Sequence, residues 1–194
     1  MGIDEFLREI RQCRFCKADP TEGLGTPFVY SSTGPDILVV SEMPSASAWK
    51  EDIGTLWAKH DLFTRSTKGA PHKLCEWLDL DWNEATNRFF WIQRSNCTVS
   101  IGKPFAFQHC SSRFLGRAVE LVKPRLIFIL GGSAAEYFFQ FDKVEDVVGK
   151  IMTFRGYDCI VFYHPSPAAG KWHKRPEQIE SIALAKQRIK GTPD

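Results

Sequence analysis

Four short apolar runs constrain the fold of this 194-residue chain more than any other feature. Each run is apolar at successive positions rather than at every second one, which is the pattern of a strand covered on both faces by other elements. The runs are DILVVS (36–41), RFFWIQ (88–93), LIFILG (126–131) and DCIVFY (158–163). They predict a four-stranded sheet that is buried on both sides.

Helical patterns lie around these runs. We expect an opening helix in MGIDEFLREI and further helices over approximately 67–79, 108–122, 133–141 and 176–190. Strands that alternate with helices favour a mostly parallel sheet. The predicted fold class is therefore α/β, a three-layer αβα arrangement. The chain has no internal repeat, low-complexity tract or long linker, so we expect residues 1–194 to form a single domain.

Small or polar residues follow each of the four strands. The carboxyl ends of parallel strands share one edge of the sheet, and ligands bind in the crevice outside that edge. The sequence therefore predicts a site assembled from segments that are far apart in the chain. The residues expected to converge there are Glu42, Gln93, Gly131, Gly132 and His164.

The charge balance limits how the chain can bind nucleic acid. It has 25 Lys and Arg against 23 Asp and Glu, a formal net charge of +2. Any phosphate-binding surface must then be a local patch. We find no membrane-spanning run and no signal-peptide pattern, so we expect a cytoplasmic protein that does not bind membranes.

The six cysteines fall into two groups. Without an export signal, disulfides are not expected. Cys75 lies in an apolar-periodic run and Cys159 in a strand, so both are interpreted as small core residues. The other four form a C-x2-C pair and, eighty residues later, a C-x12-C pair: Cys13, Cys16, Cys97 and Cys110.

Four thiolates in a reducing compartment fit zinc or an iron–sulfur cluster. The second pair is wider than a zinc ribbon normally uses, which favours the cluster. The alternative is four unrelated thiols.

These motifs, in this order, resemble the iron–sulfur uracil-DNA glycosylases known as family 4, with family 5 as a close relative. The resemblance covers approximately residues 10–190. It begins with the C-x-x-C of Cys13 and Cys16. The later matching segments are SEMPS (41–45), DLFTR (61–65), WIQRSNC (91–97), KPRLIFILGGSAA (123–135) and HPSP (164–167).

The resemblance implies a role for each of these segments. Glu42 would orient a water and stabilise an oxocarbenium-like sugar, and His164 would donate a hydrogen bond to the departing base. Phe63 would stack on the flipped base. Substrate-binding positions would be Ser41, Met43, Phe63, Gln93 and Ser166, and Cys13, Cys16, Cys97 and Cys110 would hold a [4Fe-4S] cluster.

Simpler roles remain open for three of these residues. Glu42 can cap the following turn or helix, Phe63 can be an ordinary core residue, and His164 can be structural.

The segment AAGKWHKR (168–175) would be a DNA-facing loop. Lys171, Lys174 and Arg175 would contact phosphates, and Trp172 or a small residue would wedge into the base stack. The alternative is a solvated loop that leads into the last helix.

The chain departs from the family pattern in its first motif and at the base-reading position. Ser41 and Ser45 replace glycines, and Gln93 replaces an asparagine with a side chain one methylene longer. A longer amide can shift the pose of the base or the base that is preferred.

The expected function is hydrolysis of the N-glycosidic bond of uracil, or a related deaminated base, in single- or double-stranded DNA. The product would be an abasic site in base excision repair, and we expect the protein to be a monomer. One alternative is a glycosylase for another damaged base, such as hypoxanthine. Two others are a non-catalytic four-cysteine metal protein that binds nucleic acid and a nucleotide-binding α/β protein that uses GGSAA (131–135).

Overall fold

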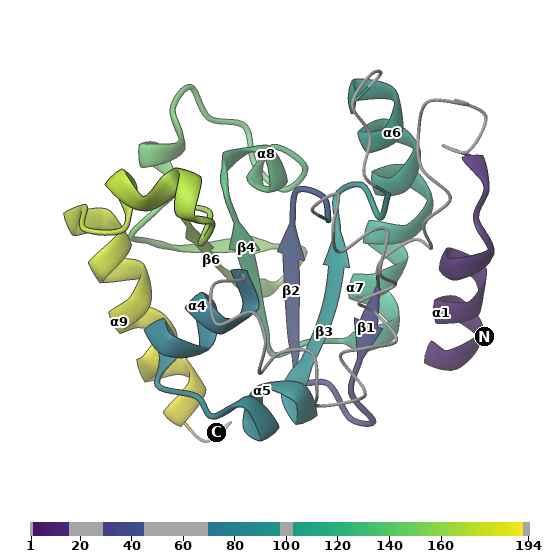
Figure 1. Cartoon of the computed structure of the whole chain (residues 1–194), viewed down its shortest axis with the longest axis horizontal. Coiled ribbons are helices and arrows are strands. Elements are labelled where there is room, and N and C mark those ends of the chain that lie inside the picture. Colours follow the sequence, from purple (N-terminus) through teal and green to yellow (C-terminus); the bar gives the residue numbers. More distant parts are fainter. Residues whose placement is uncertain (1, 16–28, 45–69, 98–102, 192–194) are drawn as a thin grey trace.

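The fold is built on one six-stranded sheet with the order β1-β3-β2-β4-β6-β5 (Figure 1). The structure is a computed structural model and describes residues 2–15, 29–44, 70–97 and 103–191. The four inner strands are parallel and coincide with the four apolar runs. They are β3 (Phe89–Gln93), β2 (Ile37–Ser41), β4 (Leu126–Leu130) and β6 (Tyr157–Phe162).

The sheet has two more strands than the four expected from the sequence. Strands β1 (Tyr30–Ser31) and β5 (Ile151–Phe154) add antiparallel edges to the parallel centre. Neither has the sequence pattern of a strand buried on both faces, because β1 has two residues and β5 is partly exposed along its length.

Residues of the inner strands alternate between two hydrophobic cores. In β2, Leu38 and Val40 enter the core under α1 (Ile3–Gln12), α7 (Gly116–Val122) and α8 (Gly132–Ala135). Ile37 and Val39 enter the core under α4 (Ala70–Leu78), α5 (Trp82–Arg88) and α9 (Pro176–Lys190). The other inner strands alternate in the same way. Both faces of the sheet are therefore covered, which confirms the three-layer α/β architecture.

Most helices lie where the sequence patterns place them, and α9 matches its expected range in full. The larger helices are α1 (Ile3–Gln12), α4 (Ala70–Leu78), α5 (Trp82–Arg88), α6 (Lys103–Cys110), α7 (Gly116–Val122), α8 (Gly132–Ala135) and α9 (Pro176–Lys190). A π-helical turn (Ser111–Leu115) joins α6 to α7, and the short 3₁₀ turns are η4 (Val144–Asp146) and η5 (Pro167–Trp172). No helix in these ranges is long and apolar enough to cross a membrane.

Three helical expectations need correction. The helix expected from residue 108 already begins at Lys103, and α5 has no counterpart in the sequence patterns. The helix expected over 133–141 ends at Ala135. Aromatic residues follow it, and these are weak helix formers. Phe138 instead packs edge-on against Phe154 of β5, with ring centroids 4.9 Å apart.

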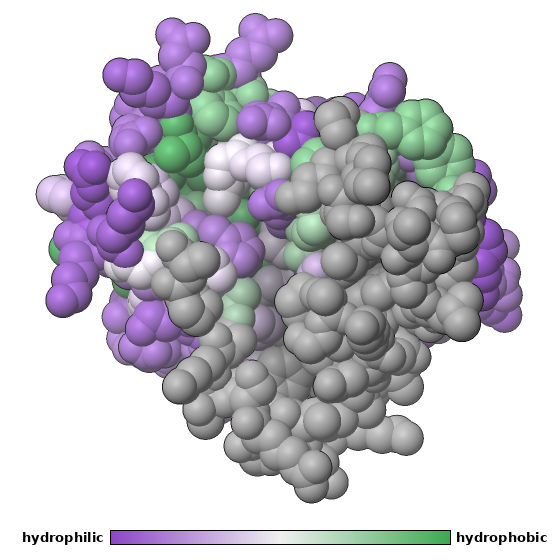
Figure 2. Space-filling view, turned by 45° about the horizontal axis from the view of Figure 1, so that its top comes forward, coloured by the Kyte–Doolittle hydropathy of each residue, from purple (hydrophilic) through white to green (hydrophobic). Residues whose placement is uncertain are grey.

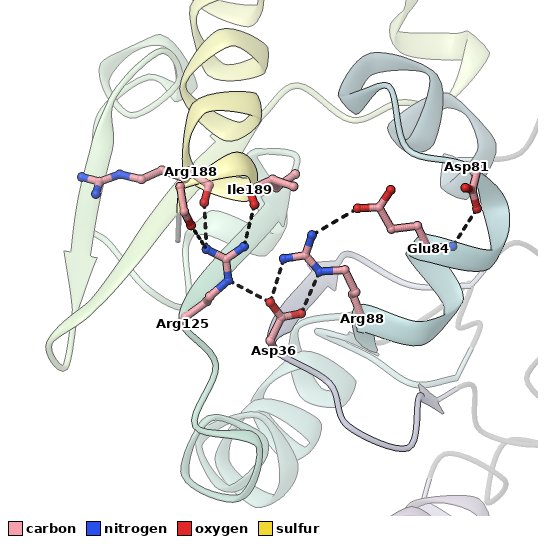
Figure 3. A network of polar contacts seen from close by, with 8 residues as sticks. Asp36, Asp81, Glu84, Arg88, Arg125, Arg188 and Ile189 are labelled. Carbon is pink, nitrogen blue, oxygen red and sulfur yellow. Dashed lines mark hydrogen bonds and ion pairs between the residues drawn. The ribbon is translucent and has the colours of Figure 1, made fainter. Parts of the chain in front are cut away.

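An ion-pair network joins four elements at the amino edge of the sheet (Figure 3). The carboxylate of Asp36 accepts hydrogen bonds from Arg88 Nη2 (2.7 Å) and Arg125 Nε (2.8 Å). Arg125 also donates to the carbonyl oxygens of Arg188 and Ile189, at 2.8 and 3.0 Å. The start of β2 is thereby tied to the end of α5, the start of β4 and the end of α9.

Two opposing effects set the pKa of Asp36. Burial pushes this pKa upward, but the hydrogen bonds and charges of Arg88 and Arg125 outweigh burial, so the pKa lies below its ordinary value. The carboxylate is therefore charged at neutral pH and holds both guanidinium groups.

Asp36→Asn should lower the free energy of unfolding by about 1 to 3 kcal/mol, because two half-buried arginines would lose their charged acceptor. Urea denaturation measures the difference. The control is Glu76→Gln, which removes the exposed pair between Lys73 and Glu76 and should cost less than about 0.5 kcal/mol. Equal losses for the two variants would contradict the structural role of the network.

Candidate active site at the carboxyl edge of the sheet

The carboxyl ends of the parallel strands come together as the sequence predicts. Ser41 of β2 pairs in register with Gln93 of β3. Contact continues beyond both strands, because Arg94 N–H donates to the Ser41 carbonyl (2.7 Å) and Ser95 N–H donates to that of Glu42 (2.9 Å). Glu42 is thus held beside the segment that follows β3.

A buried hydrogen-bond chain orients the amide of Gln93. Trp91 Nε1–H donates to Ser41 Oγ (3.2 Å), and the Ser41 hydroxyl donates to Gln93 Oε1. Since the indole has no acceptor, the serine proton is available for the glutamine oxygen. Part of the acceptor capacity of Gln93 is therefore used within the protein, and its NH₂ group remains to meet a ligand.

Asn96 supports the same site and was not among the expected residues. Its Oδ1 accepts the backbone N–H of Gln93 at 3.0 Å, and only 1% of the residue is exposed. Its Nδ2 is buried and has no hydrogen-bond partner in the described part of the chain. The available signal was an amide in a short polar segment directly after a buried strand.

His164 follows β6 and has a defined tautomer. The backbone N–H of Ser166 donates to His164 Nδ1 at 3.1 Å, so in the neutral ring the proton lies on Nε2. Burial lowers the pKa of His164, the carboxylate of Glu42 acts in the opposite direction, and His173 lowers it further. The net direction is downward, so the neutral imidazole with an Nε2–H donor prevails at neutral pH.

His173 also supports this loop and was assigned no role by the sequence reasoning. Its Nε2 lies 3.1 Å from the carbonyl oxygen of His164. Its ring meets Trp77 of α4 edge-on, with centroids 5.0 Å apart. The backbone of His164 is therefore connected to a helix that packs on the sheet.

Gly131 allows the close approach of β4 to His164. Its φ of 93° and ψ of 156° lie in a region that is nearly restricted to glycine. A Cβ atom at this position would lie 3.3 Å from His164 Cβ and 3.6 Å from its Cδ2. A side chain here would strain the backbone and displace the imidazole.

We expect Gly131→Ala to lower the free energy of unfolding by about 1 to 3 kcal/mol and to shift the His164 ring resonances. Thermal melts and NMR of the histidine side chains measure these effects. Gly34→Ala is the matched control, because a Cβ atom at Gly34 would meet nothing within 4 Å and the backbone there has no positive φ. A Gly131→Ala protein as stable as the control would refute this account of the turn.

Two of the other predicted substrate-binding residues, Met43 and Ser166, lie within the described part of the chain, and Phe63 does not. Met43 is partly buried against Cys97 and Ala106, which connects the segment after β2 to α6. Ser166 contacts His164 through its backbone, as described above. Phe63 lies outside the described residues, so its stacking role stays a prediction.

The loop after His164 carries three exposed cations, as predicted: Lys171, Lys174 and Arg175. The neighbouring Trp172 is half-buried and stacks on Tyr163, with centroids 5.3 Å apart. Lys171 Nζ and the Arg175 guanidinium lie 5.0 and 4.8 Å from the centre of the Trp172 ring. This geometry favours an anchoring role for Trp172, and insertion into DNA stays a prediction.

Arg94 is a third residue whose role the sequence reasoning missed. It follows Gln93, donates to the carbonyl oxygen of Ser133, and pairs with Glu136 at 2.6 Å. Its guanidinium also lies 4.6 Å from the centre of the Phe107 ring. Arg94 therefore links the site to α8 and α6, and its only sequence signal was a lone cation at the end of a buried strand.

Three of the four proposed metal ligands lie around α6. Cys13 Sγ is 3.9 Å from His109 Nε2, Cys110 is the last residue of α6, and Cys97 packs on Ala106 one turn earlier. Cys16 lies outside the described residues. Within the described ranges, no three Cys, His, Asp or Glu side chains form a metal-binding group. The three described cysteines therefore do not form a metal site by themselves, and the four-cysteine ligand set stays a prediction.

The two remaining cysteines have the expected core positions. Cys75 and Cys159 are buried, and burial raises the pKa of each thiol to about 12. Both are therefore neutral at physiological pH, unlike a metal-bound thiolate.

Comparison with known families agrees with this fold. The family model described as the uracil DNA glycosylase superfamily matches residues 28–186, which is most of the chain and includes every inner strand. The chain therefore belongs to the uracil-DNA glycosylase superfamily. Its members are glycosylases that act on DNA, which supports both the reaction class and the partner predicted from the sequence. No curated protein matches the chain.

Proposed function

We propose that the chain is a monofunctional DNA glycosylase that releases uracil, or a closely related deaminated base, and leaves an abasic site in base excision repair. The main support is the placement of Glu42 and the neutral His164 at one sheet edge. They are close enough for the charge of the carboxylate to affect the pKa of the imidazole. Membership of the glycosylase superfamily gives this pair its chemical context.

In the proposed reaction, Glu42 and His164 each stabilise one of two developing charges of opposite sign. As the bond between C1′ and the base nitrogen breaks, its electron pair leaves with the base and positive charge develops on the sugar. Glu42 stabilises that cation and orients the water whose oxygen bonds to C1′. This water releases one proton as the bond forms, and the departing base anion takes up one proton from solvent. His164 donates from Nε2 to a base oxygen as negative charge accumulates there. The NH₂ group of Gln93 contacts a base carbonyl.

The Ser41–Gln93 hydrogen bond supports a second candidate substrate. With Oε1 partly engaged, Gln93 recognises a carbonyl more readily than the adjacent ring N–H of uracil. Uracil and hypoxanthine both present such a carbonyl, whereas cytosine and adenine present amino groups. Excision of hypoxanthine is therefore the alternative to uracil excision.

We also propose that Cys13, Cys16, Cys97 and Cys110 hold a [4Fe-4S] cluster. When bound, the cluster would supply a cross-link between the end of α1, the segment after β3 and the end of α6. Breaking a glycosidic bond requires no electron transfer, so the role assigned to these cysteines is structural.

Glu42→Gln and His164→Ala should each reduce excision at least about 100-fold, because each removes stabilisation of charge in the transition state. The assay uses labelled oligonucleotides with one uracil or one hypoxanthine, single- and double-stranded, followed by alkali to reveal abasic sites. Glu180→Gln is a matched control, since Glu180 is an exposed carboxylate on α9 outside the proposed catalytic pair.

Activity on hypoxanthine alone would select the second candidate. A folded wild-type protein that releases neither base would contradict the proposed function.

The purified protein should contain iron and acid-labile sulfide in equal amounts. Cys13→Ala should lose both, because it removes one of the four ligands, whereas Cys75→Ala should retain both, because Cys75 lies in the other hydrophobic core. Elemental analysis and visible absorbance of anaerobically prepared protein give the result. Iron-free wild-type protein, or equal iron in both variants, would exclude this ligand set.

A further inference from the structure

Three aromatic rings form a continuous stack where the end of α1 meets α6. The ring of Phe15 lies on that of His109, with centroids 3.4 Å apart and planes at 5°. Phe105 stacks with Phe15 at 4.8 Å and 27°. Phe105 is 65% exposed and Phe15 37% exposed. We call these three residues the aromatic stack.

Two cationic side chains lie beside Phe15 and His109 of the aromatic stack. Arg14 and Arg113 are exposed and, with Phe15 and His109, line a hollow of about 410 Å³. Arg14 Nη1 donates to the carbonyl oxygens of Arg11 and Cys13, which holds its guanidinium at the end of α1.

The one acidic residue among those lining the hollow is already engaged by cations. Glu9 accepts hydrogen bonds from Arg113 (3.1 Å) and Arg117 (2.7 Å). With two arginines on one carboxylate, the local charge is positive. The surface therefore combines an exposed π-face with positive charge.

The aromatic stack lies at the same end of the molecule as the candidate active site. In Figure 1 the carboxyl end of α1 and helix α6 lie side by side, near the tips of the β2 and β3 arrows. Met43 and Cys97 pack on Ala106 of α6, which connects this helix to the segment containing Glu42. The exposed cations in and directly after η5 belong to the β6 side of the same edge.

Figure 2 brings this edge of the molecule toward the viewer. Hydrophilic surface predominates on the left, where α9 lies in Figure 1, and hydrophobic surface appears at the upper right. Further hydrophobic surface appears toward the upper centre, and hydrophilic surface returns at the right margin, so polar and apolar surface alternate in this view.

We propose that the aromatic stack is a binding site for single-stranded DNA, separate from the base pocket. A base stacks on the exposed face of Phe105, and Arg14 and Arg113 contact the neighbouring phosphates. Aromatic rings combined with basic side chains are how proteins bind single strands without reading their sequence. This proposal rests on the proposed function in one respect, that the chain acts on DNA. Binding at the aromatic stack requires no damaged base.

The test is binding of a fluorescent oligodeoxycytidine, which contains no excisable uracil, measured by anisotropy. Phe105→Ala should raise Kd about 10-fold, because it removes the face on which a base stacks. Phe105→Trp should retain binding near the wild-type level. The combined Arg14→Gln and Arg113→Gln variant should weaken binding and reduce its dependence on salt.

Ile179→Ala is the matched control. Ile179 is another exposed apolar side chain, 58% exposed, but it lies on α9. Its Kd should equal that of the wild type. Thermal melts and iron content of each variant establish that Phe105→Ala is folded, and Phe105 lies outside the C-x-x-C motif.

Equal binding by the wild type and Phe105→Ala would overturn the proposal, as would equal loss in Phe105→Ala and Ile179→Ala. A wild-type protein that does not bind the oligonucleotide would also overturn it. The two proposals fail separately. A protein that binds through Phe105 but leaves every damaged base intact would refute only the glycosylase function, and active enzyme with unchanged binding in Phe105→Ala would refute only this site.

Discussion

Parallel, in-register pairing of the four inner strands is the constraint on which the rest of the molecule depends. The pairing aligns Ile37 of β2 with Phe89 of β3 on one side and with Leu126 of β4 on the other. Such strands must be connected by crossovers, and here helices cover both faces and complete two separate cores. The same pairing brings the strand ends to one edge of the sheet, so Glu42 lies beside Ser95. The carboxylate of Glu42 raises the pKa of His164, against the larger effect of burial.

The two edges of the sheet use polar groups differently. At the amino edge, Asp36 and two arginines satisfy one another and tie elements together. At the carboxyl edge, buried polar groups are satisfied only in part. Gln93 has its oxygen engaged by Ser41, and Asn96 retains a buried amide nitrogen with no described partner. Unsatisfied buried polar groups are costly, and in native proteins they concentrate where a ligand is bound. The ion-pair network thus serves the fold at the amino edge, and the buried amide nitrogen of Asn96 leaves one polar group at the carboxyl edge available to a ligand.

Buried runs made the centre of the fold predictable from the sequence. The inner strands and α9 were located correctly because their apolar patterns are strong, and the shared edge of Glu42, Gln93 and His164 followed from parallel topology. The edge strands were missed because β1 is too short and β5 too exposed to show such a pattern. The roles of Arg94 and Asn96 depend on contacts between separate segments, which spacing alone does not encode. The family resemblance supplied the chemical roles of the site residues and cysteines, and these roles remain predictions.

The π-helical turn between α6 and α7 absorbs one extra residue without changing the relative phase of the two helices. A π turn closes its hydrogen bonds over one more residue than an α turn, so Ser111–Leu115 holds an additional residue within about one turn. Ala118 and Val119 face the core on one side of it, and His109 faces Phe15 on the other. Deleting one residue from the turn would convert it to an ordinary α turn and leave both sets of contacts in place. Deleting one residue within α6 would instead rotate the preceding residues by about 100°. A related chain can therefore be one residue shorter at Ser111–Leu115 and keep both the core and the α1–α6 contact.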